Sequence, residues 1–259
     1  MVEWFEWLEV LWPAQYIFIL GHMRSRSSLL SHLLGSHPEI RGYTESHIKY
    51  RNHWDLLRLR WHVARSIRAW PRGQYLLDKQ LHSRMYLPAS LRASDKLRAI
   101  VLVRPPLETI ESIVRMGLRT GNHRDADPCH AAVYYCERVA LLSSMAIELR
   151  DRALLVDSNY LIDQPKSALL AIGEHLRLGT PLQPQYQAMS RTGRSGAGDM
   201  SPLIHTGEIV PFRSKASIVA LPREWMRRVE QSHAHFVEDA TAWAPSIGFS
   251  NHMSMQHSQ

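Results

Sequence analysis

The sequence predicts an α/β fold in which helices cover both faces of a doubly wound parallel sheet. Three observations lead to this prediction. Short runs of apolar, β-forming residues, such as Tyr16–Leu20 and Ala99–Val103, have the composition of strands buried on both faces. Segments in which apolar residues recur with helical spacing separate these runs. Strands and helices therefore alternate along the chain, as they do in doubly wound sheets.

The elements of the first part of the chain are assigned from composition and spacing. Tyr16–Leu20 (YIFIL), which ends at Gly21, predicts a buried parallel strand. A stripe of four leucines predicts a helix over Ser27–Ser36. Ile40–Tyr43 is a weaker candidate for a second strand. A helix is also expected over Arg51–Trp70, with one face formed by Trp54, Leu57, Trp61 and Ala64.

The remainder of the chain continues this alternation. Gln74–Asp78, Ala99–Val103 and Ala153–Val156 are predicted strands, and the second of them (AIVLV) is the clearest buried strand of the sequence. The expected helices are Leu107–Leu118, His130–Arg150, Lys166–Leu176 and Arg223–Asp239. Met189–Ser214 is rich in Gly, Ser, Thr and Pro and has no periodicity, so it is expected to be a long loop, either functional or disordered.

Length and composition indicate one domain. The chain has 259 residues, of which 45% are hydrophobic and 21% charged, enough to bury a sizeable core. Since we find no internal repeat, low-complexity tract or clear linker, residues 1–259 are assigned to a single domain. Residues 1–14 are expected to form an N-terminal extension and 251–259 a frayed tail.

The sequence carries no sign of export or of a membrane anchor. Met1–Trp12 lacks the basic and long apolar regions of a signal peptide. No stretch approaches the roughly 18 apolar residues of a membrane helix. Cys129 and Cys136, seven positions apart on a predicted helix, are interpreted as reduced core residues. We therefore expect a cytoplasmic protein without a membrane partner.

The basic composition favours an anionic ligand. The chain has 31 Lys and Arg against 24 Asp and Glu, a formal net charge of +7. Arg dominates the basic set, and its guanidinium can bind phosphate or sulfate through two parallel hydrogen bonds. The same charge also suits nucleic acid or a merely basic surface.

The segment between the first strand and the first helix has the features of an anion site. Its sequence is Gly21-His-Met-Arg-Ser-Arg-Ser-Ser28, and it lies where backbone N–H groups and the helix dipole favour negative charge. Arg24, Ser25, Ser27 and Ser28 add side-chain donors. The segment matches neither a Walker A loop, which needs a Lys and a second Gly, nor a dinucleotide fingerprint.

This segment resembles the 5′-phosphosulfate loop of the sulfotransferases, in the branch that holds the tyrosylprotein and carbohydrate enzymes and their bacterial relatives. That loop commonly reads R-S-G-T-[ST]-L-L and is followed about ten residues later by H-P. Here the chain has Arg24-Ser-Arg-Ser-Ser-Leu-Leu30 and then His37-Pro38. Arg26 stands where the family usually has Gly, so this side chain either crowds the loop or adds a cation.

A second signature follows the strand AIVLV. The block LVRPPLETIES resembles the family's 3′-phosphate signature, and Arg104 and Ser112 match its Arg and Ser. Arg104 lies at the carboxyl end of a strand, where such sheets bind ligands, and Ser112 lies about two helical turns further on. The resemblance implies that 3′-phosphoadenosine-5′-phosphosulfate is the cosubstrate. A looser match, Arg191-Thr-Gly193 in the long loop, implies a cover over the nucleotide.

The resemblance also implies catalytic residues. Glu45 in Arg41-Gly-Tyr-Thr-Glu45-Ser-His47 matches a catalytic Glu after the second strand and is our first candidate for the base. His47 and His22 are the rivals, because cytosolic sulfotransferases use a His; His22 is also a candidate for binding sulfate. Lys79 is expected to stabilise the leaving oxygen, and Arg24 to serve in both binding and catalysis.

Other classes of function remain as alternatives. A P-loop-like nucleotide kinase or NTPase needs a Lys in the first loop and a carboxylate for Mg²⁺, and the sequence offers neither clearly. A basic anion-binding module without enzymatic activity leaves the paired motifs unexplained. No metal is expected, because no H-E-x-x-H, C-x-x-C or comparable cluster is present.

The acceptor is expected to carry a hydroxyl group, on a small molecule, a carbohydrate or a carrier-linked chain. The walls of the acceptor-binding site are predicted to be the helix Arg51–Trp70 and the segment Met116–Asp127. The arginines of this second segment fit an acidic acceptor. We expect no nucleic acid as a partner. Relatives are often dimers, so a homodimer is the assembly to test for.

Overall fold

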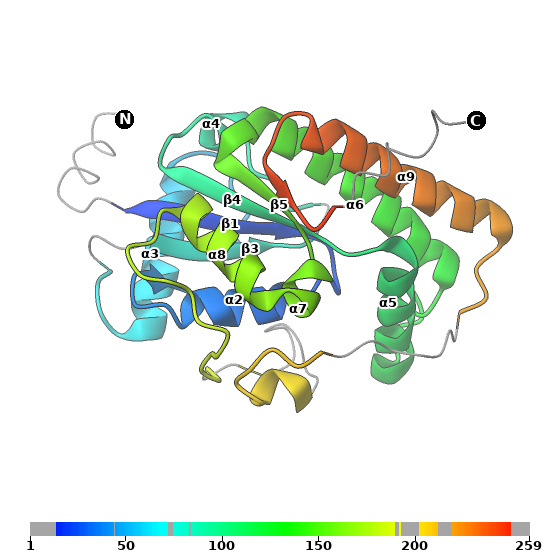
Figure 1. Cartoon of the computed structure of the whole chain (residues 1–259), viewed down its shortest axis with the longest axis horizontal. Helices are drawn as coiled ribbons and strands as arrows, with labels where there is room; N and C mark the ends of the chain where they lie inside the picture. The colour runs from blue at the N-terminus through cyan, green and yellow to red at the C-terminus, as the bar shows by residue number, and fades with distance from the viewer. Residues whose placement is uncertain are drawn as a thin grey trace.

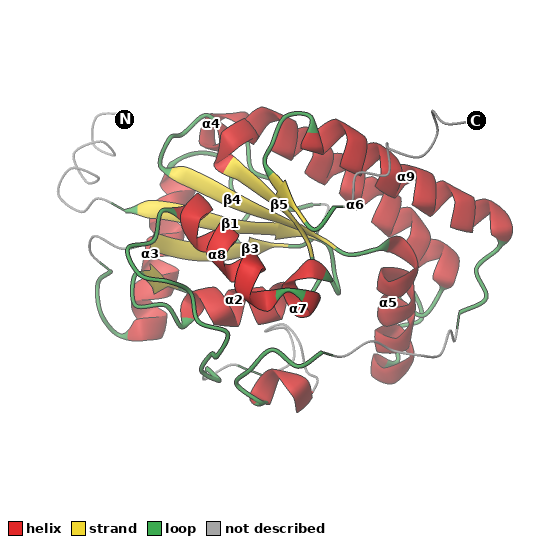
Figure 2. Cartoon of the chain, viewed as in Figure 1, coloured by secondary structure: helices red, strands yellow, loops and turns green. Residues whose placement is uncertain are grey.

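The predicted parallel sheet is present. The computed structural model describes residues 14–43, 45–71, 75–82, 84–189, 192, 202–211 and 219–249. Within them, six parallel strands pair in the order β2-β3-β1-β4-β5-β6. Figure 2 labels four of them, β3, β1, β4 and β5. Their bounds are β1 Gln15–Gly21, β2 Ile40–Arg41, β3 Tyr75–Gln80, β4 Leu97–Val103, β5 Ala153–Asp157 and β6 Ser246–Ile247.

Helices cover both faces of this sheet, as expected for a doubly wound fold (Figure 1). One apolar core joins the sheet to α3 (Trp54–Ile67), α4 (Ala89–Arg92), α5 (Pro106–Thr120), α6 (Pro128–Leu149) and α9 (Arg223–Thr241). The other core joins it to α2 (Ser27–Gly35), α7 (Tyr160–Asp163) and α8 (Pro165–Leu176). Two short 3₁₀ helices, η1 Arg150–Arg152 and η2 Pro202–His205, complete the described elements.

The burial of the two central strands, β1 and β4, explains their apolar sequences. Every residue of Tyr16–Leu20 and of Ala99–Val103 is buried, because β1 and β4 have a strand on each side and a layer of helices on each face. Both runs therefore had to be apolar throughout, and both predictions are confirmed. The short elements α4, α7 and β6 were not predicted, since four residues or fewer carry no periodicity.

The predicted apolar face of α3 was wrong. The side chains that α3 buries against the sheet are those of Leu56, Leu59 and Val63, whereas Trp61 is 66% exposed. Branched aliphatic residues spaced three and four apart define the packed stripe, and the size of the tryptophans misled the assignment. The two cysteines lie on α6, free and half-buried; Cys136 packs against the core as expected, whereas Cys129 does not.

A buried arginine ties the carboxyl ends of the strands together. Arg138 of α6 is fully buried and donates to the carbonyl oxygens of Gly21 at 2.7 Å and Gln80 at 2.5 Å. It also donates to the carbonyl oxygens of His82 at 3.0 Å and Met85 at 3.2 Å. Burial lowers the pKa of this guanidinium to about 10, and it stays charged. The ends of β1 and β3 are thereby held side by side at the edge where the cavity opens.

Several expectations fall outside the described part of the chain. Apart from Ala14, the predicted N-terminal extension lies outside it, and so does the predicted tail, residues 251–259. Of the long loop predicted at Met189–Ser214, residues 189, 192 and 202–211 are described and include η2. Among the helices that the structure describes, none has the length and apolar character needed to cross a membrane.

Candidate active site

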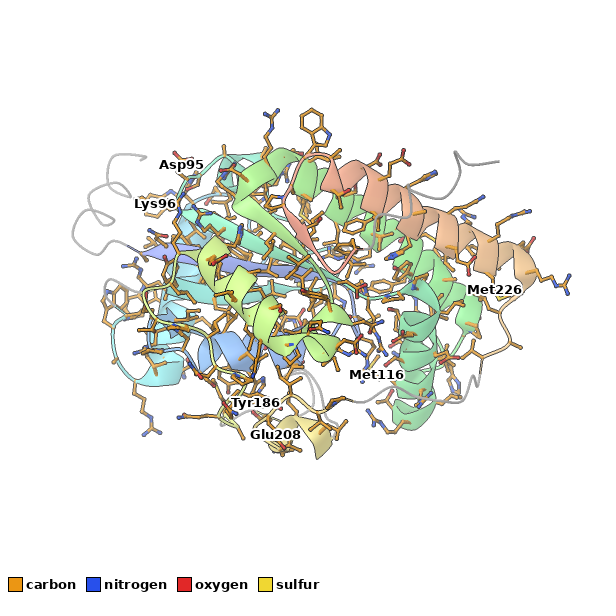
Figure 3. All side chains as sticks on the ribbon, viewed as in Figure 1. Asp95, Lys96, Met116, Tyr186, Glu208 and Met226 are labelled. Carbon is orange, nitrogen blue, oxygen red and sulfur yellow. The ribbon has the colours of Figure 1, made fainter. Side chains whose placement is uncertain are left out.

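A cavity of about 550 Å³ opens at the carboxyl end of the sheet. Its walls come from the β1–α2 loop, the segment after β2, the end of β3, the outer face of α5 and the segment around η2. Met116, Tyr186 and Glu208, three of its lining residues, are labelled at the lower side of Figure 3. Asp95 and Lys96, which precede β4, lie at the opposite end of the sheet. This placement is the one that open α/β sheets use for ligands.

The β1–α2 loop owes its shape to two left-handed residues. Arg24 has a φ of 63° and Arg26 a φ of 64°, a region that costs a residue with a side chain roughly 1–2 kcal/mol. The loop turns sharply there and presents the first turn of α2 to the cavity. No side chain caps this helix end and no acidic residue lies in its first turn. Ser27 and Ser28, which line the cavity, therefore sit at a helix N-terminus, where backbone N–H groups and the helix dipole favour an anion.

The two candidate anion signatures lie in contact with each other. Arg24 Nε donates to the hydroxyl of Ser112 at 2.9 Å, which links the β1–α2 loop to α5. Arg104 Nη1 lies 3.4 Å from the carbonyl oxygen of Arg24. All three residues line the same cavity. Side chains that lie 88 positions apart in the sequence thus form one surface rich in hydrogen-bond donors.

Glu108 occupies the centre of this surface, and sequence reasoning missed it. Its Oε2 atom accepts from Arg104 Nη2 at 2.9 Å and from Arg104 Nε at 3.1 Å. Asn159 Nδ2 donates to its Oε1 at 3.0 Å. Burial raises the pKa of this carboxyl, but the hydrogen bonds from Asn159 and Arg104 outweigh burial and lower the pKa overall. Glu108 is therefore ionised at neutral pH and neutralises Arg104.

Glu45, the first candidate for the base, lies buried in the cavity wall. Its Oε1 has no hydrogen-bond partner among the described residues. His82 Nε2 lies 3.7 Å from this oxygen and His47 Nδ1 lies 3.9 Å from it. Buried carboxylate oxygens normally have a hydrogen-bond partner, and Oε1 of Glu45 lacks one among the described residues. This oxygen can therefore accept a proton or a hydrogen bond from a ligand.

Asp78 of β3 fixes the backbone that carries Glu45. The two oxygens of its buried carboxylate accept from the Ser46 amide at 2.8 Å and the Ser46 hydroxyl at 2.6 Å. The Tyr50 hydroxyl adds a third bond at 2.8 Å. Because neighbouring residues of a strand point to opposite faces, Asp78 holds this segment while Lys79 points toward α2.

Lys79 lies behind the anion loop, outside the cavity lining. It is buried, and its Nζ is 3.4 Å from the hydroxyl of Ser28, which does line the cavity. Ser25 is also buried outside the lining, and its hydroxyl has no hydrogen-bond partner among the described residues. The roles predicted for both residues stay predictions.

The structure gives His22 a clear structural contact. The buried ring bonds through Nδ1 to the Met23 carbonyl oxygen at 2.9 Å and accepts from the Arg104 amide through Nε2 at 3.0 Å. Burial lowers the pKa of His22 to about 3, so the ring is neutral and Nε2 keeps its lone pair. Tyr135 donates its hydroxyl to the Arg104 carbonyl oxygen at 3.0 Å and bonds to His233 Nδ1 at 2.9 Å. The backbone of Arg104 is thus held on both sides; the predicted contact of His22 with sulfate stays a prediction.

Other predicted parts of the site have mixed outcomes. Arg191 and Gly193 lie outside the described residues. No residue of α3 lines the cavity, whereas Arg115, Met116 and Arg119 of α5 do line it, and the predicted acceptor walls stay predictions. Among the described residues, no group of three or more His, Cys, Asp and Glu side chains is arranged to hold a metal ion.

His82 and Asn159 are further site residues that the sequence analysis did not single out. His82 lies three positions after Lys79, and its place at the end of a predicted strand is a signal that was available. Glu108 lies inside the block LVRPPLETIES and was equally visible. Asn159 carries no local signal, because its contact with Glu108 depends on the pairing of β4 with β5.

Comparison with known proteins agrees with the fold. No protein-family model matches the chain, and no curated protein matches it in sequence. The sulfotransferase domain from the curacin biosynthetic pathway is 19% identical, with a TM-score of 0.62 over 85% of this chain and 98% of that domain. The sulfotransferase domain from the Synechococcus PCC 7002 olefin synthase is 20% identical, with a TM-score of 0.54 over 85% and 94% of the two chains. The chain therefore has the fold of these sulfotransferase domains.

Proposed function

We propose that the chain is a sulfotransferase that moves a sulfuryl group from 3′-phosphoadenosine-5′-phosphosulfate to a hydroxyl group of an acceptor. The observation that carries the proposal is the convergence of two separate anion-binding elements and a buried carboxylate on one cavity. A donor with phosphate at two positions needs two such elements. The acceptor hydroxyl needs a base, and Glu45 supplies one.

The donor is held at both of its charged ends. The backbone N–H groups of the α2 N-terminus, with Arg24, Ser27 and Ser28, bind the phosphosulfate. Arg104 and Ser112 bind the 3′-phosphate through charge-assisted hydrogen bonds. The apolar side chains of the lining, which include Leu29 and Ile204, give the adenine base a surface to pack on.

The chemical step is an in-line displacement at sulfur. Glu45 takes the proton of the acceptor hydroxyl while that oxygen forms a bond to sulfur. The bond between sulfur and the phosphate oxygen breaks, and 3′,5′-adenosine bisphosphate leaves with the electron pair. Lys79 acts through its contact with Ser28, where it offsets the negative charge that develops on the leaving oxygen. No metal is required in this scheme, because the cations near the sulfate are side chains.

The proposal is tested with a nucleotide titration. The melting temperature is measured with 3′,5′-adenosine bisphosphate, AMP and ATP, since a ligand that binds only the native state stabilises it by mass action. At a hundredfold excess over Kd the gain is about 2.7 kcal/mol. Stabilisation by the bisphosphate alone supports the donor site. An equal response to ATP favours a kinase or NTPase, and no response to any nucleotide favours an anion-binding module.

A further inference from the structure

Arg26 reaches across the cavity from an unfavourable backbone position. Its φ of 64° lies in the left-handed region that favours glycine. Its Nη1 donates to the hydroxyl of Ser158 at 3.1 Å and to Asn159 Oδ1. These partners follow β5, two strands away from the strand that carries the loop. The guanidinium, with 12% of the side chain exposed, is fixed beside the ends of β4 and β5.

Two guanidinium groups meet at one oxygen atom there. Glu108 Oε2 accepts from Arg104 at 2.9 and 3.1 Å, and Arg26 Nη2 lies 3.9 Å from the same atom. The two arginines come from different loops and line the cavity together with Glu108. The position of Oε2 therefore marks a place where one anionic oxygen is attracted by two cations at once.

A phosphate monoester suits this place better than a carboxylate does. Near neutral pH it carries close to two negative charges and three acceptor oxygens, so it can engage both guanidinium groups at the same time. Glu108 carries one charge and reaches Arg26 at a longer distance than Arg104. The Glu108 side chain is 34% exposed, so it has room to turn toward solvent when a phosphate enters.

We infer that Arg26 is a second guanidinium for the donor's 3′-phosphate, and that it sets how strongly this protein distinguishes nucleotides with a 3′-phosphate from those without one. The inference rests on the proposed function and extends it. Arg104 and Ser112 supply the contacts that the family signature implies. Arg26 adds a contact that a glycine at this position has no side chain to make.

The test compares two nucleotides on three proteins. Isothermal titration calorimetry gives Kd for 3′,5′-adenosine bisphosphate and for AMP with the wild type, Arg26→Gly and Arg177→Gly. Arg177 has a φ of 57° at the end of α8 and does not line the cavity. Arg177→Gly therefore removes one positive charge and one strained backbone position, as Arg26→Gly does, but away from the cavity. Arg26→Gly is expected to weaken bisphosphate binding at least tenfold and to leave AMP binding within twofold. Arg177→Gly is expected to leave both values within twofold.

The outcomes separate this inference from the function on which it rests. A wild-type protein that binds AMP as tightly as the bisphosphate overturns the proposed donor. A wild-type preference that Arg26→Gly retains overturns the role of Arg26 and leaves the donor intact. A parallel loss for both nucleotides also overturns it, because Arg26 then binds the 5′ end. Should Arg26→Gly fold poorly, Arg26→Asn repeats the test, since Asn tolerates left-handed backbone.

Discussion

Replacing Arg138 with Met removes the clamp that joins the ends of β1 and β3. Met has a similar reach but no donor, so four carbonyl oxygens, two of them buried and two partly buried, lose the bond from Arg138. Each unpaired group costs about 1–3 kcal/mol. Part of this cost is offset, because burial of the guanidinium, which lowers its pKa to about 10, itself costs about 3 kcal/mol. We expect the free energy of unfolding to fall by about 1–9 kcal/mol, and each kcal/mol corresponds to a decrease in Tm of roughly 2–4 °C.

Urea unfolding at 25 °C measures this loss. Arg227→Met, an exposed arginine on α9, is the matched control and is expected to change the free energy of unfolding by less than about 0.5 kcal/mol. Arg138→Lys keeps the charge but reaches fewer carbonyl groups. Its free energy of unfolding should therefore lie between those of the wild type and Arg138→Met. The reasoning fails if Arg138→Met is as stable as Arg227→Met. Folded Arg138→Met is also expected to bind the bisphosphate more weakly, because Arg138 holds the carbonyl oxygen of Gly21, where the β1–α2 loop begins.

Four further outcomes are expected. Glu45→Gln should lower the rate of bisphosphate release with an acceptor at least 100-fold while Kd for the bisphosphate stays within twofold; near-normal turnover would move the base to His47 or His82. Glu108→Gln should tighten bisphosphate binding about fivefold in calorimetry, because the competing charge is gone; weaker binding would mean that the carboxylate only orients Arg104. Burial lowers the pKa of three histidines, to about 3 for His22 and about 4 for His175 and His233, so unfolding takes up protons below pH 6.5. Stability is then complete above pH 6.5 and falls by up to about 4 kcal/mol per pH unit near pH 5, and a flat Tm between pH 7.5 and 5 would contradict this. Chelation with EDTA should leave turnover unchanged, and a loss restored by added metal would contradict the metal-free scheme.

The parts of the fold and site that could be predicted are those with a local signal. The runs YIFIL and AIVLV identify the two central strands, because only strands covered on both faces are apolar throughout. The Arg and Ser residues that follow these strands are then brought to one edge by the topology of the sheet. The contact of Arg24 with Ser112 follows from that rule, although they are 88 positions apart.

The remaining parts depend on distances that only the folded chain sets. Arg26 contacts Ser158 and Asn159, which lie more than 130 positions away, because β5 pairs with β4 and β4 with β1. Burial of His22 likewise arises from Tyr135 and Arg104, not from its neighbours in the sequence. The left-handed backbone of Arg24 was also hidden, since Gly is the residue that normally signals it, whereas the Gly that the family usually has at position 26 was an available signal for Arg26.

The order of the strands has a consequence for synthesis. Among the described strands, β1 leaves the ribosome first; it pairs with β3 and β4, where Ile17 lies beside Leu77 and Arg98. At about 5–20 residues per second, the apolar run YIFIL waits roughly 5–15 s before both partners exist. Throughout that time its edges are open to pairing with other chains. The nascent chain is therefore expected to be most prone to aggregation before Val103 emerges, and a chaperone that binds short apolar segments is expected to engage it there.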